Sequence, residues 1–235
     1  MNEITEINLL FSNKSAVEIL TYFIDKYKDK IALASSLSIE DQVLTDMILK
    51  INRETKIFTL DTGRLPYETY KLIDETNSFY GNKLDVMFPQ SFLIEEMVKG
   101  KGINLFYNSV DERKLCCYNR KVEPLNRALK GLDVWICGLR KEQSVTRENL
   151  QLVEPDINRN MLKINPLLDW TMDDVWKYIR HNNVPYNKLY DNSYKSIGCA
   201  PCTRSVGEGE DIRNGRWWWE DPNTKECGLH IKNYK

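Results

Sequence analysis

The chain has 235 residues, 42% of them hydrophobic, and a formal net charge of −1. This length and composition suit one large α/β domain, or one domain with a substantial tail. The balanced charge argues against a general binder of nucleic acid or membrane surfaces, because both need a basic field. No basic start precedes an apolar run, and no stretch approaches the roughly 20 apolar residues of a membrane helix. We therefore expect a soluble, cytoplasmic protein with no nucleic-acid or membrane partner.

Short apolar strands alternate with amphipathic helices along most of the chain. Helices are predicted over residues 15–27, 40–50, 66–80, 91–98, 118–130 and 171–181. Strands are predicted over residues 31–34, 56–60, 84–88, 133–138 and 162–164. This alternation predicts right-handed βαβ units, and so an α/β fold with a mostly parallel sheet flanked by helices. We expect residues 1–190 to form the α/β part and residues 191–235 an irregular C-terminal segment, within a single structural domain.

Three of the predicted strands end in polar residues. These ends are Ser35-Ser36-Leu37-Ser38, Asp61-Thr62-Gly63 and Gly138-Leu139-Arg140. Ligands of open parallel sheets bind outside the carboxyl ends of the strands. The three segments are therefore the predicted pocket.

Six cysteines are present, and five of them stand in motifs: Cys116-Cys117, Cys199-Ala-Pro-Cys202 and Cys227. The sixth, Cys137, lies in an apolar run and is expected to be a buried small hydrophobe. A zinc ion needs its thiolates around one point, whereas adjacent helical residues point about 100° apart, so Cys116 and Cys117 converge poorly on one ion. An iron–sulfur cubane offers a separate iron to each thiolate. The spacing favours a cluster and leaves zinc or a redox dithiol open.

Cys227 stands apart from both pairs, in the polar segment Glu226-Cys227-Gly228-Leu229-His230. Lys225 and His230 favour the thiolate, which is the nucleophilic form. We interpret Cys227 as a candidate nucleophile, with an incidental surface thiol as the alternative.

Basic residues recur beside the cysteine motifs and the strand ends. They are Arg120, Lys121, Arg140, Lys141, Arg147, Arg213 and Arg216. Guanidinium groups match the geometry of phosphate and sulfate, often through two hydrogen bonds at once. The pattern predicts an oxyanion ligand, whereas the run Trp217-Trp218-Trp219 indicates packing.

Together and in this order, these motifs resemble the cluster-bearing adenylyl-sulfate reductases within the wider phosphoadenylyl-sulfate and adenylyl-sulfate reductase family. The resemblance covers about residues 31–230. Its motifs are Leu60-Asp-Thr-Gly-Arg64, Cys116-Cys117 with Arg120-Lys121, Gly138-Leu-Arg-Lys-Glu-Gln-Ser144 with Thr146-Arg147, Ile197-Gly-Cys-Ala-Pro-Cys-Thr-Arg204, Arg213-Asn-Gly-Arg-Trp-Trp-Trp219 and Glu226-Cys-Gly-Leu-His230.

The resemblance implies a fold like that of adenine-nucleotide α-hydrolases, with residues 1–190 binding the nucleotide and a modified phosphate loop at residues 35–41. It implies a [4Fe–4S] cluster on Cys116, Cys117, Cys199 and Cys202. The implied substrate-binding residues are Ser35, Ser36, Leu37, Asp61, Gly138, Lys121, Arg147, Arg213, Arg216 and His230.

The implied reaction is the reduction of adenylyl sulfate to sulfite and AMP, in sulfate assimilation and cysteine biosynthesis. Cys227 attacks the sulfate sulfur and carries the sulfonate, and thioredoxin or a similar thiol donor then releases sulfite. Splitting a difficult reaction into two displacements is ordinary covalent catalysis. A homo-oligomer is compatible with the sequence.

Three other functions compete with this one. An ATP-using adenylating enzyme, such as a tRNA thiolase, favours Ser-Gly-Gly-x-Asp-Ser in the first loop, and residues 35–41 lack its paired glycines. A phosphoadenylyl-sulfate reductase usually lacks the four cluster cysteines, although some relatives accept both nucleotides. A cluster-based redox sensor has no need of Cys227.

Ser38 stands where many members of the family have glycine, which leaves the backbone path of the predicted phosphate loop open.

Overall fold

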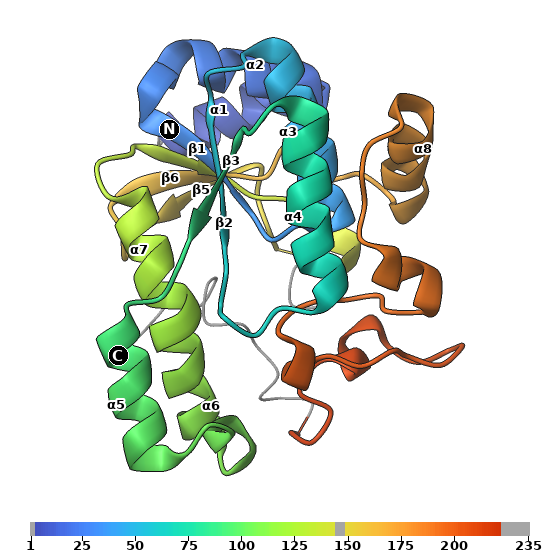
Figure 1. Ribbon diagram of the computed structural model, residues 1–235. Coiled ribbons are helices and arrows are strands. Elements are labelled where there is room, and N and C mark those ends of the chain that lie inside the picture. The colour runs from blue at the N-terminus through green and yellow to red at the C-terminus, as the bar shows by residue number, and fades with distance from the viewer. Residues whose placement is uncertain (1–2, 144–148, 222–235) are drawn as a thin grey trace. The chain divides into compact units, whose positions relative to one another are not determined.

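The structure is a computed structural model that describes residues 3–143 and 149–221 (Figure 1). The chain forms two compact units that are interleaved in sequence. The first unit comprises residues 1–59, 71–85 and 131–187, and the second comprises residues 60–70, 86–130 and 188–235. Both predicted cysteine pairs belong to the second unit. No helix within the described ranges is long and apolar enough to cross a membrane.

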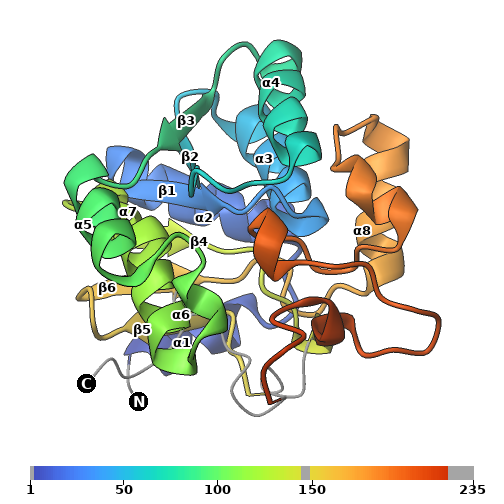
Figure 2. The same ribbon diagram turned by 60° about the horizontal axis from the view of Figure 1, so that its bottom comes forward.

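A six-stranded sheet confirms the predicted fold class, and Figures 1 and 2 show its strands from two directions. Its strand order is β3-β2-β1-β4-β6-β5. β1 is parallel to both β2 and β4, β4 is parallel to β6, and β5 is antiparallel to β6. The strands are β1 (Ile31–Ser35), β2 (Lys56–Leu60), β3 (Leu84–Met87), β4 (Val134–Ile136), β5 (Val153–Asp156) and β6 (Met161–Ile164).

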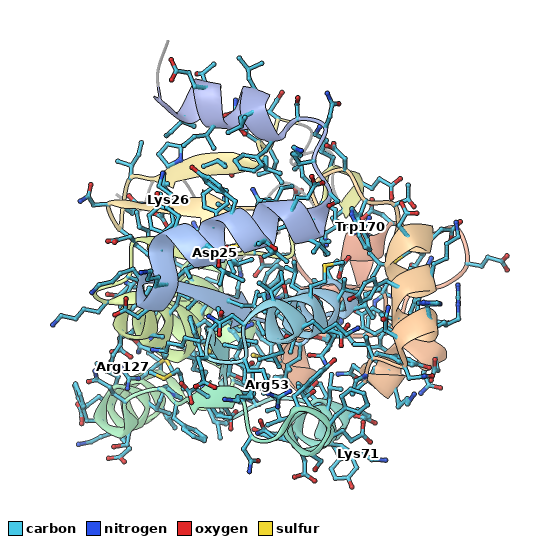
Figure 3. All side chains as sticks on the ribbon, turned by 90° about the horizontal axis from the view of Figure 1, so that it is seen from above. Asp25, Lys26, Arg53, Lys71, Arg127 and Trp170 are labelled. Carbon is cyan, nitrogen blue, oxygen red and sulfur yellow. The ribbon has the colours of Figure 1, made fainter. Side chains whose placement is uncertain are left out.

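Helices form at all the predicted places except one, and the described residues contain two further α-helices, α1 and α6. The helices are α1 (Glu3–Phe11), α2 (Ala16–Tyr27), α3 (Ile39–Ile51), α4 (Tyr67–Tyr80), α5 (Ser91–Lys101), α6 (Val110–Cys117), α7 (Glu123–Leu129) and α8 (Met172–Asn182). α8 opens with a capping box between Thr171 and Asp174, as predicted. On α2 the apolar side is buried, whereas Asp25 and Lys26 are exposed (Figure 3).

The segment predicted as a single helix over residues 118–130 is different. α6 ends at Cys117, a π-helical turn follows over Tyr118–Val122, and α7 begins at Glu123. In this turn the N–H of Glu123 donates to the carbonyl of Tyr118. Pro124 has no N–H to donate to the carbonyl of Arg120, which explains why the regular α-helical pattern gives way here. α7 continues from α6 through this turn, and α5 lies beside them in both views (Figures 1 and 2).

Helix α1 covers the edge strand β5 through one side chain. The amide of Asn8 donates to the carbonyl of Val153 at 2.9 Å and accepts the N–H of Val153 at 3.0 Å. The side chain thus takes the place of a neighbouring strand at Val153. An edge strand with open N–H and C=O groups can pair with another chain, and this contact closes part of that edge.

A buried ion pair joins the first turn of α3 to the segment after β4. Arg140 Nη2 lies 2.9 Å from Glu40 Oε1, and the two side chains are 1% and 5% exposed. Gln143 donates to the same carboxylate at 2.9 Å. Because both charges are out of water, each depends on the other.

We predict that Glu40→Gln lowers the free energy of unfolding by about 3 kcal/mol, because it leaves the buried Arg140 without its main counter-charge. Urea denaturation of wild type and variant measures the difference. Asp169→Asn is the matched control, since Asp169 pairs with Lys141 in an exposed ion pair and its loss should cost less than about 1 kcal/mol. Equal small effects in both variants would contradict the prediction.

Candidate functional site

The loop between β1 and α3 is organised around the carboxylate of Asp41. Ser36 donates its backbone N–H and its hydroxyl to Asp41 Oδ2, at 2.7 and 2.6 Å. Leu37 is buried in the left-handed conformation (φ 61°), and its N–H donates to Ser35 Oγ at 3.1 Å. Ser38 has ordinary extended backbone and caps α3 by accepting the N–H of Asp41. Ser38 therefore does not need the conformational freedom of glycine.

Gly138 closes this loop from the end of β4. A Cβ atom at this position would lie 2.3 Å from Asp41 Oδ1 and 3.0 Å from Glu40 Cβ, so only glycine fits. The predicted residues Ser35, Ser36, Leu37 and Gly138 thus surround one buried carboxylate. Burial raises the pKa of Asp41 from 3.8 to about 6, although its hydrogen bonds with Ser36 act in the opposite direction.

Asp61 organises a second loop, which belongs to the second unit. Its Oδ1 accepts the Gly63 N–H at 2.7 Å and the Tyr70 hydroxyl at 2.9 Å. The same loop reaches the second cysteine pair, because Thr62 Oγ1 lies 3.2 Å from Cys199 Sγ. The carbonyl of Arg64 also accepts the N–H of Ala200 at 2.8 Å.

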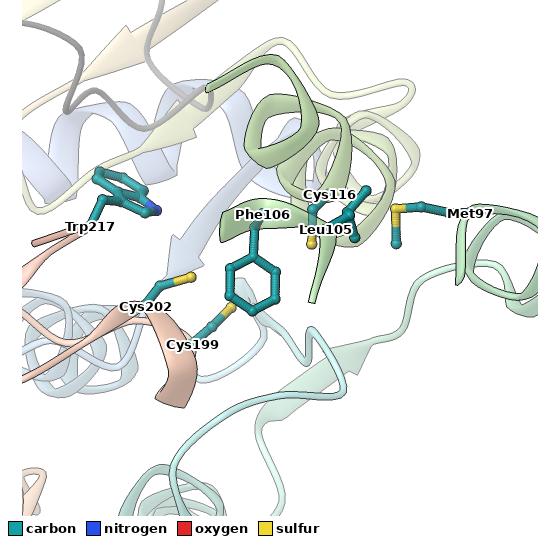
Figure 4. Packing of buried hydrophobic residues seen from close by; sticks show 7 residues of the cluster. All are labelled: Met97, Leu105, Phe106, Cys116, Cys199, Cys202 and Trp217. Atoms are coloured by element: carbon teal, nitrogen blue, oxygen red, sulfur yellow. The ribbon is translucent and has the colours of Figure 1, made fainter. Parts of the chain in front are cut away.

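Three of the four predicted ligand cysteines lie in one buried group. Cys116, Cys199 and Cys202 pack with Met97, Leu105, Phe106 and Trp217 (Figure 4). Cys117 is half-buried at the end of α6. The thiols of these four cysteines, like that of the buried Cys137, are free. We call the three buried thiols, Cys116, Cys199 and Cys202, the cysteine group.

The thiols of the cysteine group differ in their pKa values. Burial acts to raise the pKa of Cys199, but Lys121, the Thr62 hydroxyl and the neighbouring arginines outweigh it, so this pKa is lowered. Burial raises the pKa of Cys116, with partial opposition from Arg120. Burial, together with the nearby Cys199, raises the pKa of Cys202 to about 12. The strongest stabilisation of a thiolate is therefore at Cys199.

Three basic side chains border the cysteine group. Arg120 donates to the Thr62 carbonyl at 2.6 Å, and it lies with Lys121 on the π-helical turn. Arg216 approaches the second pair from the C-terminal segment, with its Nε 3.3 Å from the Cys202 carbonyl. Lys121 and Arg216 thus lie where the sequence predicted cations beside the cysteines.

Two other predicted anion-binding cations are engaged elsewhere, which corrects the prediction for them. Arg140 is paired with Glu40 and Glu142, and Lys141 with Asp169. Glu142 is two residues from Arg140, whereas Glu40 is 100 residues from Arg140 and Asp169 is 28 residues from Lys141. The motifs beside the two cations do not show that these carboxylates pair with them.

Four of the predicted site residues cannot be placed. Cys227, Arg147 and His230 lie outside the described residues, as does the side chain of Arg213. Their roles stay predictions.

The described residues can be tested against the implied [4Fe–4S] cluster. Two buried N–H groups beside the cysteine group, Trp217 Nε1 and Arg120 Nε, have no acceptor within residues 3–143 and 149–221. Within the same ranges, no three His, Cys, Asp or Glu side chains are arranged to hold one metal ion. A cubane binds each thiolate through a separate iron, and its sulfides accept hydrogen bonds. The thiols, the orphaned donors and the cations suit such a group better than a single ion.

Arg120 was predicted as one of the cations beside the cysteines, and Thr62 and Asp41 lie within predicted segments of the pocket and the loop. None of the three was predicted as a substrate-binding residue, and the contacts that they make become visible only in the structure. Asp41 ends the predicted loop, yet nothing in the sequence shows its carboxylate pointing back to Ser36.

The sheet and helices define an α/β fold of the adenine-nucleotide α-hydrolase-like type. The NH3-dependent NAD synthetase of Campylobacter jejuni shares this fold, with a TM-score of 0.52 at 9% identity over 84% of this chain and 80% of that chain. A phosphoadenylyl-sulfate reductase from Candida auris, solved as a phosphate complex, is more similar, with a TM-score of 0.75 at 28% identity over 88% of this chain and 97% of that chain.

Sequence comparison identifies the family. Residues 30–205 match the phosphoadenosine phosphosulfate reductase domain. Adenosine 5'-phosphosulfate reductase of Allochromatium vinosum is 49% identical over 94% of this chain and 86% of that protein. The chain therefore belongs to the phosphoadenosine phosphosulfate reductase family.

The raised pKa of Asp41 predicts a pH dependence of stability. Because this pKa is about 6 in the folded chain and ordinarily 3.8, the folded state binds the proton more tightly between about pH 4 and 6. The contribution of Asp41 to stability is therefore largest at low pH and falls by up to about 3 kcal/mol as pH rises through that window.

Asp41→Asn removes this titration, so the difference in unfolding free energy between variant and wild type should change between pH 4 and 7 in favour of the variant. Urea denaturation across that range measures it. Asp25→Asn, on the exposed side of α2, controls for a general change in charge. A constant difference between Asp41→Asn and wild type would contradict the prediction.

Proposed function

We propose that this chain reduces adenylyl sulfate to sulfite and AMP, with thioredoxin or a similar dithiol as electron donor. The observation that carries the proposal is the cysteine group bordered by Lys121 and Arg216. A phosphosulfate is an anion, and cations must offset its charge before a thiolate can approach. The name of the Allochromatium vinosum relative supports the same substrate.

In the proposed first step, the Cys227 thiolate attacks the sulfur of the sulfate group. A sulfur–sulfur bond forms, the bond from that sulfur to the bridging oxygen breaks, and AMP leaves with the electron pair. Cys227 then carries a sulfonate, Cys–S–SO3⁻. Lys121 and Arg216, with Arg213 and Arg147, neutralise the phosphosulfate during the attack. His230 contacts the thiolate or the substrate.

In the second step a donor thiolate attacks the Cys227 sulfur. Sulfite leaves with the electrons of the broken sulfur–sulfur bond, and a mixed disulfide joins Cys227 to the donor. The second thiol of the donor then attacks this disulfide and regenerates Cys227 as the donor becomes oxidised. The two electrons gained by the sulfate sulfur therefore come from the dithiol.

We propose that Cys116, Cys117, Cys199 and Cys202 hold a [4Fe–4S] cluster. When bound, such a cluster would supply thiolate-ligated irons and sulfide acceptors. The N–H groups of Trp217 and Arg120 would donate to it, and Lys121 would offset its charge. The lowered pKa of Cys199 favours the deprotonated ligand.

The adenosine part is assigned to the loop of Ser35, Ser36 and Leu37, with Gly138. Asp61, in the second unit, stays a separate predicted contact of the substrate. Asp41 engages both donors of Ser36, which fixes the loop before any ligand binds. Such preorganisation lowers the entropy lost on binding.

Reduction of phosphoadenylyl sulfate, alone or beside adenylyl sulfate, is the second candidate. The observation in its favour is the likeness to the Candida auris phosphoadenylyl-sulfate reductase. The two nucleotides differ only at the ribose 3′ position. A site built for a hydroxyl would leave an added phosphate poorly paired and partly desolvated.

We predict that sulfite release with reduced thioredoxin is much faster from adenylyl sulfate than from its 3′-phosphorylated form, and that Cys227→Ser releases none from either. Cys137→Ala is the matched control, because Cys137 is a buried thiol outside the cysteine group. Equal rates from the two nucleotides would support dual use and leave the mechanism intact. A normal rate in Cys227→Ser would exclude the mechanism.

The cluster has its own prediction. Protein purified without oxygen should contain about four irons and four sulfides per chain, and Cys116→Ser should lose both, because it removes one of the four proposed ligands. Iron and acid-labile sulfide analysis measures this, again with Cys137→Ala as control. Stoichiometric zinc in active, anaerobically purified protein would contradict it.

A further inference from the structure

The indole of Trp217 lies against two guanidinium groups. The Cζ atoms of Arg113 and Arg216 are 4.7 and 4.6 Å from its ring centroid. Guanidinium groups at this distance are attracted by the quadrupole of the ring, and more strongly when water is excluded. Trp217 is 2% exposed and also packs against the cysteine group. One side chain therefore connects the cysteine group to both arginines.

The two arginines differ in whether a carboxylate neutralises their positive charge. Arg113 is 1% exposed and forms two hydrogen bonds with the carboxylate of Glu220, at 2.9 and 2.8 Å. Across residues 3–143 and 149–221, Arg216 has no carboxylate within salt-bridge distance, and its hydrogen bonds go to the carbonyls of Cys202 and Ile197. The positive charge of Arg113 is thus neutralised inside the protein, whereas that of Arg216 is left for another anion.

Gly198 provides the space in which Arg216 lies. A Cβ atom on Gly198 would be 2.4 Å from Arg216 Nη2 and 2.5 Å from its Cζ. Any other residue at this position would push the guanidinium away. The clash involves only the end of a flexible side chain, so an alanine would move Arg216 with little disturbance of the backbone.

The backbone of Trp217 is itself strained. Its φ angle of 42° lies in the left-handed region, which a bulky residue rarely adopts. Such strain persists only where the surroundings over-determine a conformation, and it is concentrated at functional sites. Here the buried contacts with Arg113 and Glu220 provide that constraint.

We propose that Trp217, anchored by the buried Arg113–Glu220 pair, is a positioning residue that holds the Arg216 guanidinium over Gly198 to receive the oxyanion of the substrate. The inference rests on the proposed function, because it assigns a purpose to Arg216 in that reaction. It adds three residues that act through Arg216 rather than on the substrate: Trp217, Arg113 and Glu220.

The sharpest test is Gly198→Ala, because it displaces the guanidinium without removing it. The KM for adenylyl sulfate should rise at least tenfold, while the melting temperature and the iron content stay near those of wild type. In an Arg216→Ala background the same substitution should have no further effect on KM, since the group through which it acts is gone. An unchanged KM, or an equal rise with and without Arg216, would overturn the proposal.

Trp217 is tested by the pair Trp217→Phe and Trp217→Leu. Phenylalanine keeps an aromatic face for Arg216, so its KM should stay within a few-fold of wild type, whereas leucine should raise KM at least tenfold. A similar KM in both variants would contradict a positioning role. If Trp217→Leu does not fold, Gly198→Ala still tests the placement of the Arg216 guanidinium, and an unchanged KM there would overturn the proposal. Lys101→Ala, which breaks an exposed pair with Glu112 in the same unit, is the control and should change neither KM nor iron content.

Failure of the proposed function can be distinguished from failure of this inference. If wild type releases no sulfite from either nucleotide, the proposed function fails. Calorimetric titration with inorganic sulfate then tests the positioning directly, because Gly198→Ala should weaken sulfate binding only when Arg216 is present. If wild type turns over adenylyl sulfate and Gly198→Ala leaves KM unchanged, only the inference fails.

Discussion

Burial and positive charge act against each other at the cysteine group, and the chemistry of the second unit depends on the result. Taking a thiol out of water raises its pKa, and this effect dominates at Cys116 and Cys202. At Cys199 the cations prevail, because Lys121 and two arginines lie close enough to outweigh burial. The protein thereby keeps three thiols in an apolar environment while the pKa of one of them, Cys199, is lowered.

The source of those cations explains much of the local architecture. Lys121 and Arg120 lie on the π-helical turn that follows the first cysteine pair, and Arg216 comes from the C-terminal segment. A wide turn changes the direction of side chains relative to a regular helix, so it alters which residues face the thiols. Pro124 gives that turn a local cause.

In the first unit a negative charge has the organising role. The buried Asp41 carboxylate collects the Ser36 donors and approaches Gly138 so closely that a side chain there is excluded. A loop held by an internal anion is already ordered, in contrast with a glycine-rich loop that orders around phosphate. In the first unit a buried carboxylate thus fixes a polar loop before a ligand arrives, whereas in the second unit the cations lower the pKa of the buried Cys199 thiol.

Local features of the sequence predicted local structure well. The capping box at Thr171 and Asp174 depends on residues three apart, and the buried strands β1 and β4 consist almost entirely of apolar residues. β5 was missed because it is short and contains Pro155, which argues against a strand. The π-helical turn was missed because the periodicity around Pro124 still resembles a regular helix.

In the site as well, some features could be predicted from the sequence and others could not. The spacing of the cysteines and the family motifs predicted one site on Cys116, Cys117, Cys199 and Cys202. The structure packs Cys116, Cys199 and Cys202 in one buried group, and the role of the four as ligands stays a prediction. The partners of Arg140 and Arg113 could not be predicted, since Glu40 and Glu220 are each 100 or more residues away. Which cation is neutralised and which is left for a ligand depends on tertiary contacts of that kind.

The interleaving of the two units has a consequence for biosynthesis. The second unit draws on residues 60–70, 86–130 and 188–235, so it cannot be completed until the last of these segments leaves the ribosome. Cys116 is made 83 residues before Cys199 (199 − 116). At ordinary translation speeds that gap lasts roughly 4 to 17 seconds. During this time the first cysteine pair lacks the segment that later buries it, and it is open to oxidants and to metal ions. The cysteine group can therefore form only after most of the chain has been synthesised.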